Sequence, residues 1–120
     1  MPPQKNQLIV TADDVALHRG MTLGAIAAHR EGIVTACSVV ANGRDLSHAV
    51  ELLQECPGLD VGVHLTLVEE RPLCNAADVP GLVNANGFFH KNFAAFTARY
   101  FAGAVKLDQF EREFLSEIEL

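Results

Sequence analysis

The sequence predicts an α/β fold built on a parallel sheet, and two observations carry this prediction. Three short apolar segments suited to strands, at residues 7–12, 33–41 and 59–67, alternate with segments of helical periodicity at residues 20–31 and 46–53. Strand–helix alternation of this kind is typical of α/β folds with parallel sheets. Apolar residues make up 49% of the 120-residue chain and charged residues 20%, which is the balance of a globular domain.

The first strand is predicted at residues 7–12, and it leads directly into two carboxylates, Asp13 and Asp14. A helix is expected from about Gly20 to Glu31, and Gly32 stands where a helix-terminating glycine belongs. One side of this helix is expected to carry Leu23, Ile26, Ala27 and Arg30.

The second strand, at residues 33–41, is rich in Val, Thr and Ile and is broken by Asn42 and Gly43. The helix that follows is better defined, because its apolar residues recur at i, i+3, i+4 and i+7 and Pro57-Gly58 stops it. These residues are Leu46, Ala49, Val50 and Leu53.

The third strand, at residues 59–67, alternates strictly between two faces. One face carries Gly62, His64 and Thr66. The other carries four aliphatic residues, Val61, Val63, Leu65 and Leu67. If the aliphatic face packs under helices, His64 points into a barrel interior or pocket.

Beyond residue 68 the pattern changes to a polar loop at residues 69–80, a hairpin signal at Asn86-Gly87 and two further helices. The first of these helices is marked by Phe93, Phe96, Thr97 and Tyr100. The second begins with Asp108 and Glu111 spaced as a capping box, and its apolar side is expected to comprise Phe110, Phe114 and Ile118. With only three strands, residues 1–120 are expected to form a single incomplete domain, about half of a typical barrel of ~250 residues.

Composition excludes several classes of function. The formal charge is −6, with 9 basic residues outnumbered by 15 acidic ones, which argues against nucleic-acid binding. No apolar run approaches the ~20 residues of a membrane-spanning helix. The apolar run at residues 8–10 is too short for a signal-peptide core, so a cytoplasmic location is expected. Cys37, Cys56 and Cys74 are spaced unlike a zinc or redox motif and are expected to be free thiols.

Asp13 and Asp14 form the strongest local candidate for a site. Parallel α/β folds place their sites at the carboxyl ends of strands. Adjacent residues of an extended strand point to opposite sides, so a turn is needed to bring both carboxylates into one pocket. One could then bind a metal while the other takes a proton from water. The alternative is that one of them only caps the following helix.

His64 strengthens the metal hypothesis, because imidazole is a common metal ligand and a histidine with an aspartate forms part of many catalytic metal sites. A single strand histidine can instead be a hydrogen-bonded core residue, and this alternative stays open. Aspartate and histidine serve several ions, so the divalent metal is either zinc or magnesium.

Several segments resemble the YdjC-like carbohydrate deacetylase family. The first strand with Ala12-Asp13-Asp14 is similar to the family's opening motif, and residues 28–36 to the helix-to-strand junction after it. Residues 61–67 match its Gly-x-His-Leu strand, and residues 70–73 the loop that follows. Residues 79–88 look most like the hopanoid-biosynthesis (HpnK-like) branch. The similarity covers nearly the whole chain.

This resemblance implies the N-terminal part of a modified (β/α) barrel that removes N-acetyl groups from amino sugars or glycolipids. It further implies that Asp14 and His64 bind the metal and that Asp13 is the general base. Two departures stand out. The family continues its Asp-Asp motif with Phe-Gly, whereas Val15 and Ala16 follow here, so the loop is expected to differ. The family's second metal-binding histidine and its general-acid histidine lie beyond residue 120.

We therefore expect these 120 residues alone not to be a competent deacetylase. Two alternatives belong to other classes. A magnesium-binding phospho-acceptor (receiver) module has a similar length and an Asp-Asp pair, but it needs an aspartate where His64 stands and a late-strand lysine, whereas Lys106 lies between predicted helices. A non-catalytic remnant would instead use its open sheet edge as an interface and form homo-oligomers.

Overall fold

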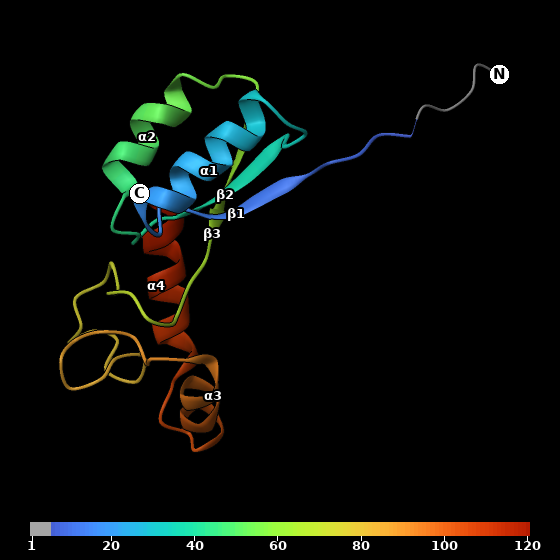
Figure 1. The fold of residues 1–120 in the computed structure, drawn as a ribbon. Helices are drawn as coiled ribbons and strands as arrows, with labels where there is room; N and C mark the ends of the chain where they lie inside the picture. The colour runs from blue at the N-terminus through green and yellow to red at the C-terminus, as the bar shows by residue number, and fades with distance from the viewer. Residues whose placement is uncertain (1–5) are drawn as a thin grey trace.

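The computed structural model describes residues 6–120 and confirms the α/β prediction. Its sheet has three parallel strands in the order β1-β2-β3, and two helices cover one face of it (Figure 1). The elements of this region are β1 (Thr11–Val15), α1 (Arg19–Arg30), β2 (Ala36–Val40), α2 (Leu46–Gln54) and β3 (Asp60–His64).

The strands are shorter than predicted, and β1 is shifted toward the carboxylates. It begins at Thr11, where its partner β2 begins in register at Ala36, and it continues through Asp13 and Asp14 to Val15. The predicted start at residue 7 is wrong because the segment before Thr11 has no strand beside it to pair with. Similarly, the chain leaves the sheet after His64, so residues 65–67 are not part of β3.

The main core lies between the sheet and the two helices. It includes Val15 of β1, Cys37 of β2, Ile26 of α1 and Ala49 of α2, all almost inaccessible to solvent. The helix α1 is rotated relative to the prediction, because its buried residues are Thr22, Ala25 and Ile26. Leu23 and Ala27 are exposed, so the predicted side coincides only partly with the buried one.

Gly32 ends α1 for a reason other than the one predicted. The terminal residue Glu31 has φ −115, and Gly32 does not take up a left-handed conformation. A Cβ atom at Gly32 would lie only 2.7 Å from the carbonyl oxygen of Ala28. The glycine is therefore required by the close approach of the chain to the last turn of the helix.

The aliphatic face of β3 is uncovered, contrary to the expectation that it packs under helices. Val61 is 56% exposed and Val63 44% exposed, because α1 and α2 cover β1 and β2 and β3 is the last strand of the sheet. The two valines line a groove of about 210 Å³ together with residues of α2 and with Ile118 and Leu120 at the end of the chain.

A second region follows β3 and contains α3 (Phe93–Phe101) and α4 (Leu107–Glu119). Its separate core consists of Val79, Leu82, Phe89 and Val105. The C-terminal end of α4 reaches the sheet, and α3 lies at the far end of the molecule (Figure 1). The predicted Asn-Gly turn is confirmed, because Gly87 has φ 76 and the amide of Asn84 donates to the carbonyl oxygen of Phe88 at 2.7 Å.

The predicted capping box of α4 is wrong. The helix is capped by Lys106, without a side-chain hydrogen bond, and Asp108 lies inside the first turn. The buried face is also polar, because it consists of Gln109, Glu113 and Glu117, whereas Ile118 is exposed. These side chains accept hydrogen bonds from main-chain amides of residues 66–81, a segment that has no helix or long strand to satisfy its amides.

Two composition-based predictions can be compared with the structure. Cys37, Cys56 and Cys74 are free thiols, as expected. None of the helices within residues 6–120 combines the length and apolarity that crossing a bilayer requires. The leader-peptide argument depends partly on residues 1–5, which lie outside the described residues.

Candidate metal and catalytic site

The three residues singled out by the sequence lie together at the carboxyl edge of the sheet. Asp13 and Asp14 are in the last half of β1, and His64 is the last residue of β3. The strand β2 separates β1 from β3, and its residue Ser38 stands between the two sides. The site is therefore assembled across all three strands.

Ser38 connects the carboxylates to the imidazole. Its hydroxyl donates to Oδ1 of Asp13 at 2.8 Å, and its Oγ lies 3.1 Å from Nδ1 of His64. The same Nδ1 lies 3.4 Å from Oδ1 of Asp14. Four side chains thus form one continuous polar cluster, and Asp14 and His64 both remain partly open to solvent.

A β-bulge brings both carboxylates to one side of β1. Ala12 pairs with Cys37 and Val15 with Val39, so Asp13 and Asp14 together oppose the single residue Ser38. Asp14 has φ 61, in the left-handed region. A bulge with one residue in this conformation redirects a side chain that regular alternation would send to the opposite face. The turn that the sequence argument required therefore occurs inside the strand.

The loop after the carboxylates keeps a left-handed residue even though it lacks the expected glycine. Ala16 has φ 73. Its amide donates to Oγ1 of Thr22 at 3.2 Å, and its carbonyl oxygen accepts from the amide of Asp45 at 2.9 Å. These bonds hold a conformation that costs a residue with a side chain roughly 1–2 kcal/mol. The loop therefore keeps a positive φ at this position without a glycine, and the expectation that it differs from the family's loop stays a prediction.

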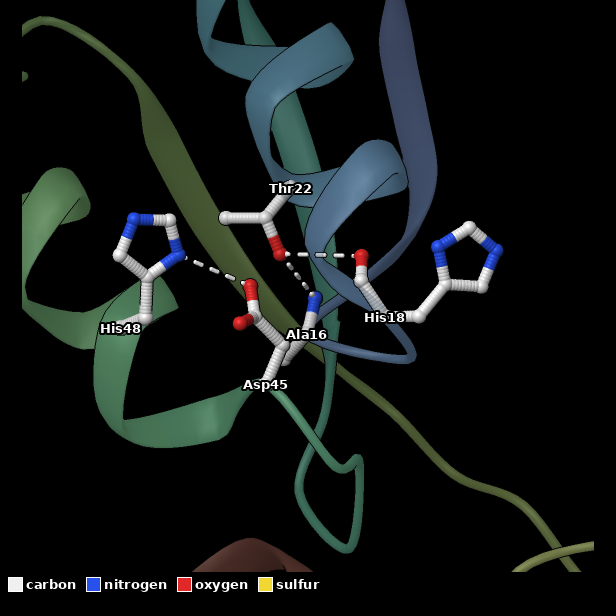
Figure 2. A network of polar contacts seen from close by, with 5 residues as sticks. All are labelled: Ala16, His18, Thr22, Asp45 and His48. Carbon is white, nitrogen blue, oxygen red and sulfur yellow. Dashed lines mark hydrogen bonds and ion pairs between the residues drawn. The ribbon is translucent and has the colours of Figure 1, made fainter.

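Figure 2 shows the polar contacts where the loops after β1 and β2 meet: Thr22 bonded to Ala16 and His18, and His48 paired with Asp45. The Nδ1 of His48 donates to Oδ2 of Asp45 at 3.0 Å, and this hydrogen bond lowers the pKa of Asp45. Gly43 is required beside it, because a Cβ atom there would lie 2.2 Å from the carbonyl oxygen of Ala16. The loops after β1 and β2 are thus in direct main-chain contact.

The distance between Asp14 and His64 fits two ligands of one metal ion. At 3.4 Å it is long for a hydrogen bond. Two atoms that each lie about 2.1 Å from a tetrahedral zinc ion are separated by about 3.4 Å. The donor types also fit, since carboxylate oxygen and imidazole nitrogen both bind zinc. Within residues 6–120 no group of three or more histidine, cysteine, aspartate or glutamate side chains converges on one point.

Ser38 is the residue that the sequence argument missed. It is the one hydroxyl residue of β2, and its register partner in β3 is Gly62, which has no side chain to cover it. The available signal was a single serine in an otherwise apolar strand. Its partner in the sheet is Gly62, which lies two residues before His64. Without the strand register this signal could not be connected to Asp13.

The remaining histidines lie outside this cluster. The Nδ1 of His29 donates to the carbonyl oxygen of Val34 at 2.8 Å, and His48 is paired with Asp45. Burial lowers the pKa of the His90 side chain. His18 lines a cavity of about 180 Å³ at the same edge of the sheet, together with Leu17, Arg44, Glu69 and Glu70.

The fold and its polar cluster define the class of this protein. It is an α/β protein whose parallel sheet carries carboxylate, serine and histidine side chains at the carboxyl ends of its strands. The chain belongs to the YdjC-like family, because the family model described as "YdjC-like protein" matches residues 7–119. This membership removes the basis of the phospho-acceptor alternative.

Curated relatives agree with this assignment. A carbohydrate deacetylase 1 of Listeria innocua is 34% identical and a carbohydrate deacetylase of Geobacillus stearothermophilus 39% identical, over 94% and 92% of this chain. A chitooligosaccharide deacetylase of Serratia marcescens is 36% identical over 88% of it. The chain spans only 44%, 42% and 40% of the lengths of these three relatives.

A solved structure supports the same fold. The crystal structure of an Enterococcus faecalis protein, named for cellobiose-phosphate cleavage, superposes with a TM-score of 0.83 at 30% identity. The match covers 92% of this chain and 41% of that one, so the present sheet and helices correspond to part of that longer chain.

Proposed function

We propose that this chain carries the N-terminal part of the active site of a metal-dependent carbohydrate de-N-acetylase. The observation that carries the proposal is the cluster of Asp13, Asp14 and His64 around Ser38 at one sheet edge. The deacetylase names of the relatives support the reaction class.

In this proposal Asp14 and His64 hold a divalent cation, zinc or magnesium. When bound, the cation makes the amide carbonyl more electrophilic and water more acidic. The 3.4 Å separation of the two donor atoms and their chemistry support this pairing. The proposal requires the His64 tautomer with an unprotonated Nδ1, whose lone pair faces the cation. Ser38 does not compete for this lone pair, because its hydroxyl hydrogen is donated to Asp13.

Asp13 is the proposed general base. Its carboxylate is exposed at the edge of the cluster, and Oδ1 is held by the hydroxyl of Ser38, which leaves Oδ2 to accept the proton of the attacking water. Ser38 is then a positioning residue, because it orients the base and contacts His64 at the same time.

We infer that these 120 residues alone do not support strong turnover. Catalytic zinc sites use three protein ligands, and the cluster supplies two within residues 6–120. In this proposal a third ligand and a proton donor for the leaving amine would have to come from outside the described cluster.

The substrate in this proposal is an acetylated amino sugar or a glycolipid that carries one. The finer assignment to a hopanoid glycolipid, based on residues 79–88, and the cytoplasmic location both stay predictions. Cell fractionation, with lipid extracts of strains with and without the gene, would test them together.

The decisive experiment is release of acetate from di-N-acetylchitobiose by a full-length protein that contains this chain. The expected result is zinc- or magnesium-dependent release that Asp13→Asn reduces at least 100-fold. The matched control is Asp78→Asn, a change at an exposed aspartate of the loop, which should leave the rate unchanged. An unchanged rate of acetate release in the Asp13→Asn variant would refute the assignment of Asp13 as the general base.

A second candidate function, a self-association interface, is favoured by the uncovered valines of β3 and by the exposed Ile118 and Leu120 beside them. Light scattering of the purified chain with and without a chelator would test it. A dimer that persists without metal and is lost in Val61→Lys would support the interface, and a monomer under both conditions would exclude it.

A further inference from the structure

The cavity beside the metal cluster is built from the loops that follow all three strands. Leu17 and His18 come after β1, Arg44 after β2, and Glu69 and Glu70 after β3. The amide of Leu17 donates to the carbonyl oxygen of Asp14 at 3.2 Å, so this wall of the cavity begins one turn after a proposed metal ligand. In parallel sheets, ligands bind in crevices outside the carboxyl ends of the strands.

Two features show that this cavity is fixed in shape. The close approach of Gly43 to Ala16 locks the loop that carries Arg44 against the loop that carries Leu17. Glu69 has φ 71, a left-handed conformation that is unfavourable for a glutamate, and its amide donates to the carbonyl oxygen of His90 at 3.1 Å. Strain of this kind in a non-glycine residue is found mainly at binding sites.

The guanidinium of Arg44 is oriented by one hydrogen bond, which occupies only one of its five N–H donors. Its Nε donates to Oε2 of Glu70 at 3.1 Å, and the Glu70 side chain is only 9% exposed. The Arg44 side chain is 72% exposed, and among residues 6–120 no acceptor is paired with its two terminal nitrogens. A buried carboxylate thus fixes a largely exposed arginine whose other four N–H donors have no partner among residues 6–120.

The lining chemistry suits hydroxyl groups. Arg44 offers donors, Glu69 offers an exposed carboxylate acceptor, and the imidazole of His18 can do either. Sugar hydroxyls both donate and accept, so they match a wall that presents both types. At about 180 Å³ the cavity is smaller than the roughly 300–1,000 Å³ of pockets for drug-sized ligands, which limits it to about one sugar ring.

The net charge of the cavity lining favours a neutral sugar over an anionic one. The five lining residues include one arginine and two glutamates. With His18 counted as neutral, the net charge of the lining is −1. Like charges repel, and an unpaired phosphate next to Glu69 and Glu70 would be unfavourable. The relative named for cellobiose-phosphate cleavage therefore does not supply the substrate class here.

We propose that this cavity is a subsite for one neutral, unphosphorylated sugar unit, with Arg44 and Glu69 as specificity-determining residues that hydrogen-bond its hydroxyl groups. The proposal rests on the proposed deacetylase function and adds the substrate class to it. Arg44 acts here through direct contact with the sugar, and Glu70 acts as the residue that positions Arg44.

The test is a titration of the ¹⁵N-labelled 120-residue chain with di-N-acetylchitobiose and, separately, with its 6-phosphate, followed by amide chemical shifts. The expected shifts concentrate at Leu17, His18, Arg44, Glu69 and Glu70. Arg44→Gln and Glu69→Gln should each weaken binding of the neutral disaccharide about 10- to 100-fold. The matched control is Arg112→Gln in α4, an exposed arginine paired with Asp108, which should bind as the unaltered chain does.

Three outcomes would overturn the subsite: shifts that avoid these five residues, equal affinity in both cavity variants, or tighter binding of the phosphorylated disaccharide. Glu69→Gln keeps the test valid even if Arg44→Gln disturbs folding through Glu70. A failure of the deacetylase proposal looks different. In that case the disaccharide binds at the cavity, but a full-length protein that contains this chain releases no acetate.

Discussion

The two regions of this chain are stabilised in different ways. In residues 11–64 the strands satisfy one another's main chains, and an apolar core that includes Val15, Ile26 and Cys37 lies under two helices. In residues 65–120 four loop amides donate instead to buried side chains of α4, those of Thr66, Leu73, Cys74 and Gly81. The comparison shows that a stripe of polar side chains on a helix can take the place of a neighbouring strand in accepting the amides of an irregular main chain.

The buried stripe repeats every four residues along α4. Gln109 accepts from the amide of Gly81 at 2.7 Å, Glu113 from the amides of Leu73 and Cys74, and Glu117 from that of Thr66 at 3.0 Å. Carboxylates that accept amide hydrogens form some of the stronger hydrogen bonds in proteins. The stripe therefore fixes the segment that begins directly after His64.

The largest expected effect is that of Glu113→Ala. This carboxylate is fully buried and accepts two main-chain amides, at 2.6 and 3.0 Å. Its removal leaves both amides without acceptors and should destabilise the chain by about 3–5 kcal/mol in urea unfolding. The matched control is Glu111→Ala, an exposed position on the same helix, which should change stability by less than about 0.5 kcal/mol. Equal effects of the two changes would contradict the proposed role of the stripe.

The next effect is pH-dependent and concerns Glu117. Burial raises the pKa of this carboxyl to about 7, and its Oε1 has no hydrogen-bond partner among the described residues. Because the folded-state pKa lies above the unfolded value of about 4.3, the stabilising contribution is complete below that value and is lost as the pH rises through 7.

The loss should be on the order of 3 kcal/mol and should disappear in Glu117→Gln, as measured by urea unfolding at pH 4.5 and pH 8. Glu119→Gln, an exposed change next to the same helix end, should keep the pH dependence. A Glu117→Gln protein that still loses this stability between the two pH values would show that another group is responsible.

The smallest effect tests the strand–helix region. Ala16→Gly should cost at least about 1 kcal/mol less than Ala28→Gly, because relief of the strain at φ 73 offsets the loss of the buried Ala16 methyl group. Ala28→Gly, at an exposed position inside α1, should destabilise the chain by about 1 kcal/mol. Thermal unfolding of both variants would measure the difference, and an equal or larger loss at Ala16 would contradict the strained conformation.

Periodicity was sufficient to predict the order of the elements in the first region, although not the bounds of β1 and β3 or the buried side of α1. The alternation of strands and helices gave the parallel sheet, and the positions of Asp13, Asp14 and His64 near strand ends gave their common edge. The β-bulge was not predictable in the same way, because a shift of one residue between Ala12 and Val15 leaves no periodic trace in the sequence. Ser38 was missed for the related reason that its partners lie on other strands.

The second region was predicted less well for a physical reason. Charged residues at i and i+4 on a helix are typical of a solvated face, so Glu113 and Glu117 gave no sign of burial. Their partners lie 39 to 51 residues away in the sequence. The metal-binding and catalytic roles of Asp13, Asp14 and His64, and the single-domain boundaries, stay predictions.

The most direct test of the central claim, that Asp14 and His64 bind one cation, is isothermal titration of the 120-residue chain with Zn²⁺, repeated with Mg²⁺. The proposed site predicts weak binding of one ion per chain, lost in Asp14→Ala and in His64→Ala and retained in Asp78→Ala. Binding that survives in both site variants, or no binding of either ion by the unaltered chain, would contradict it.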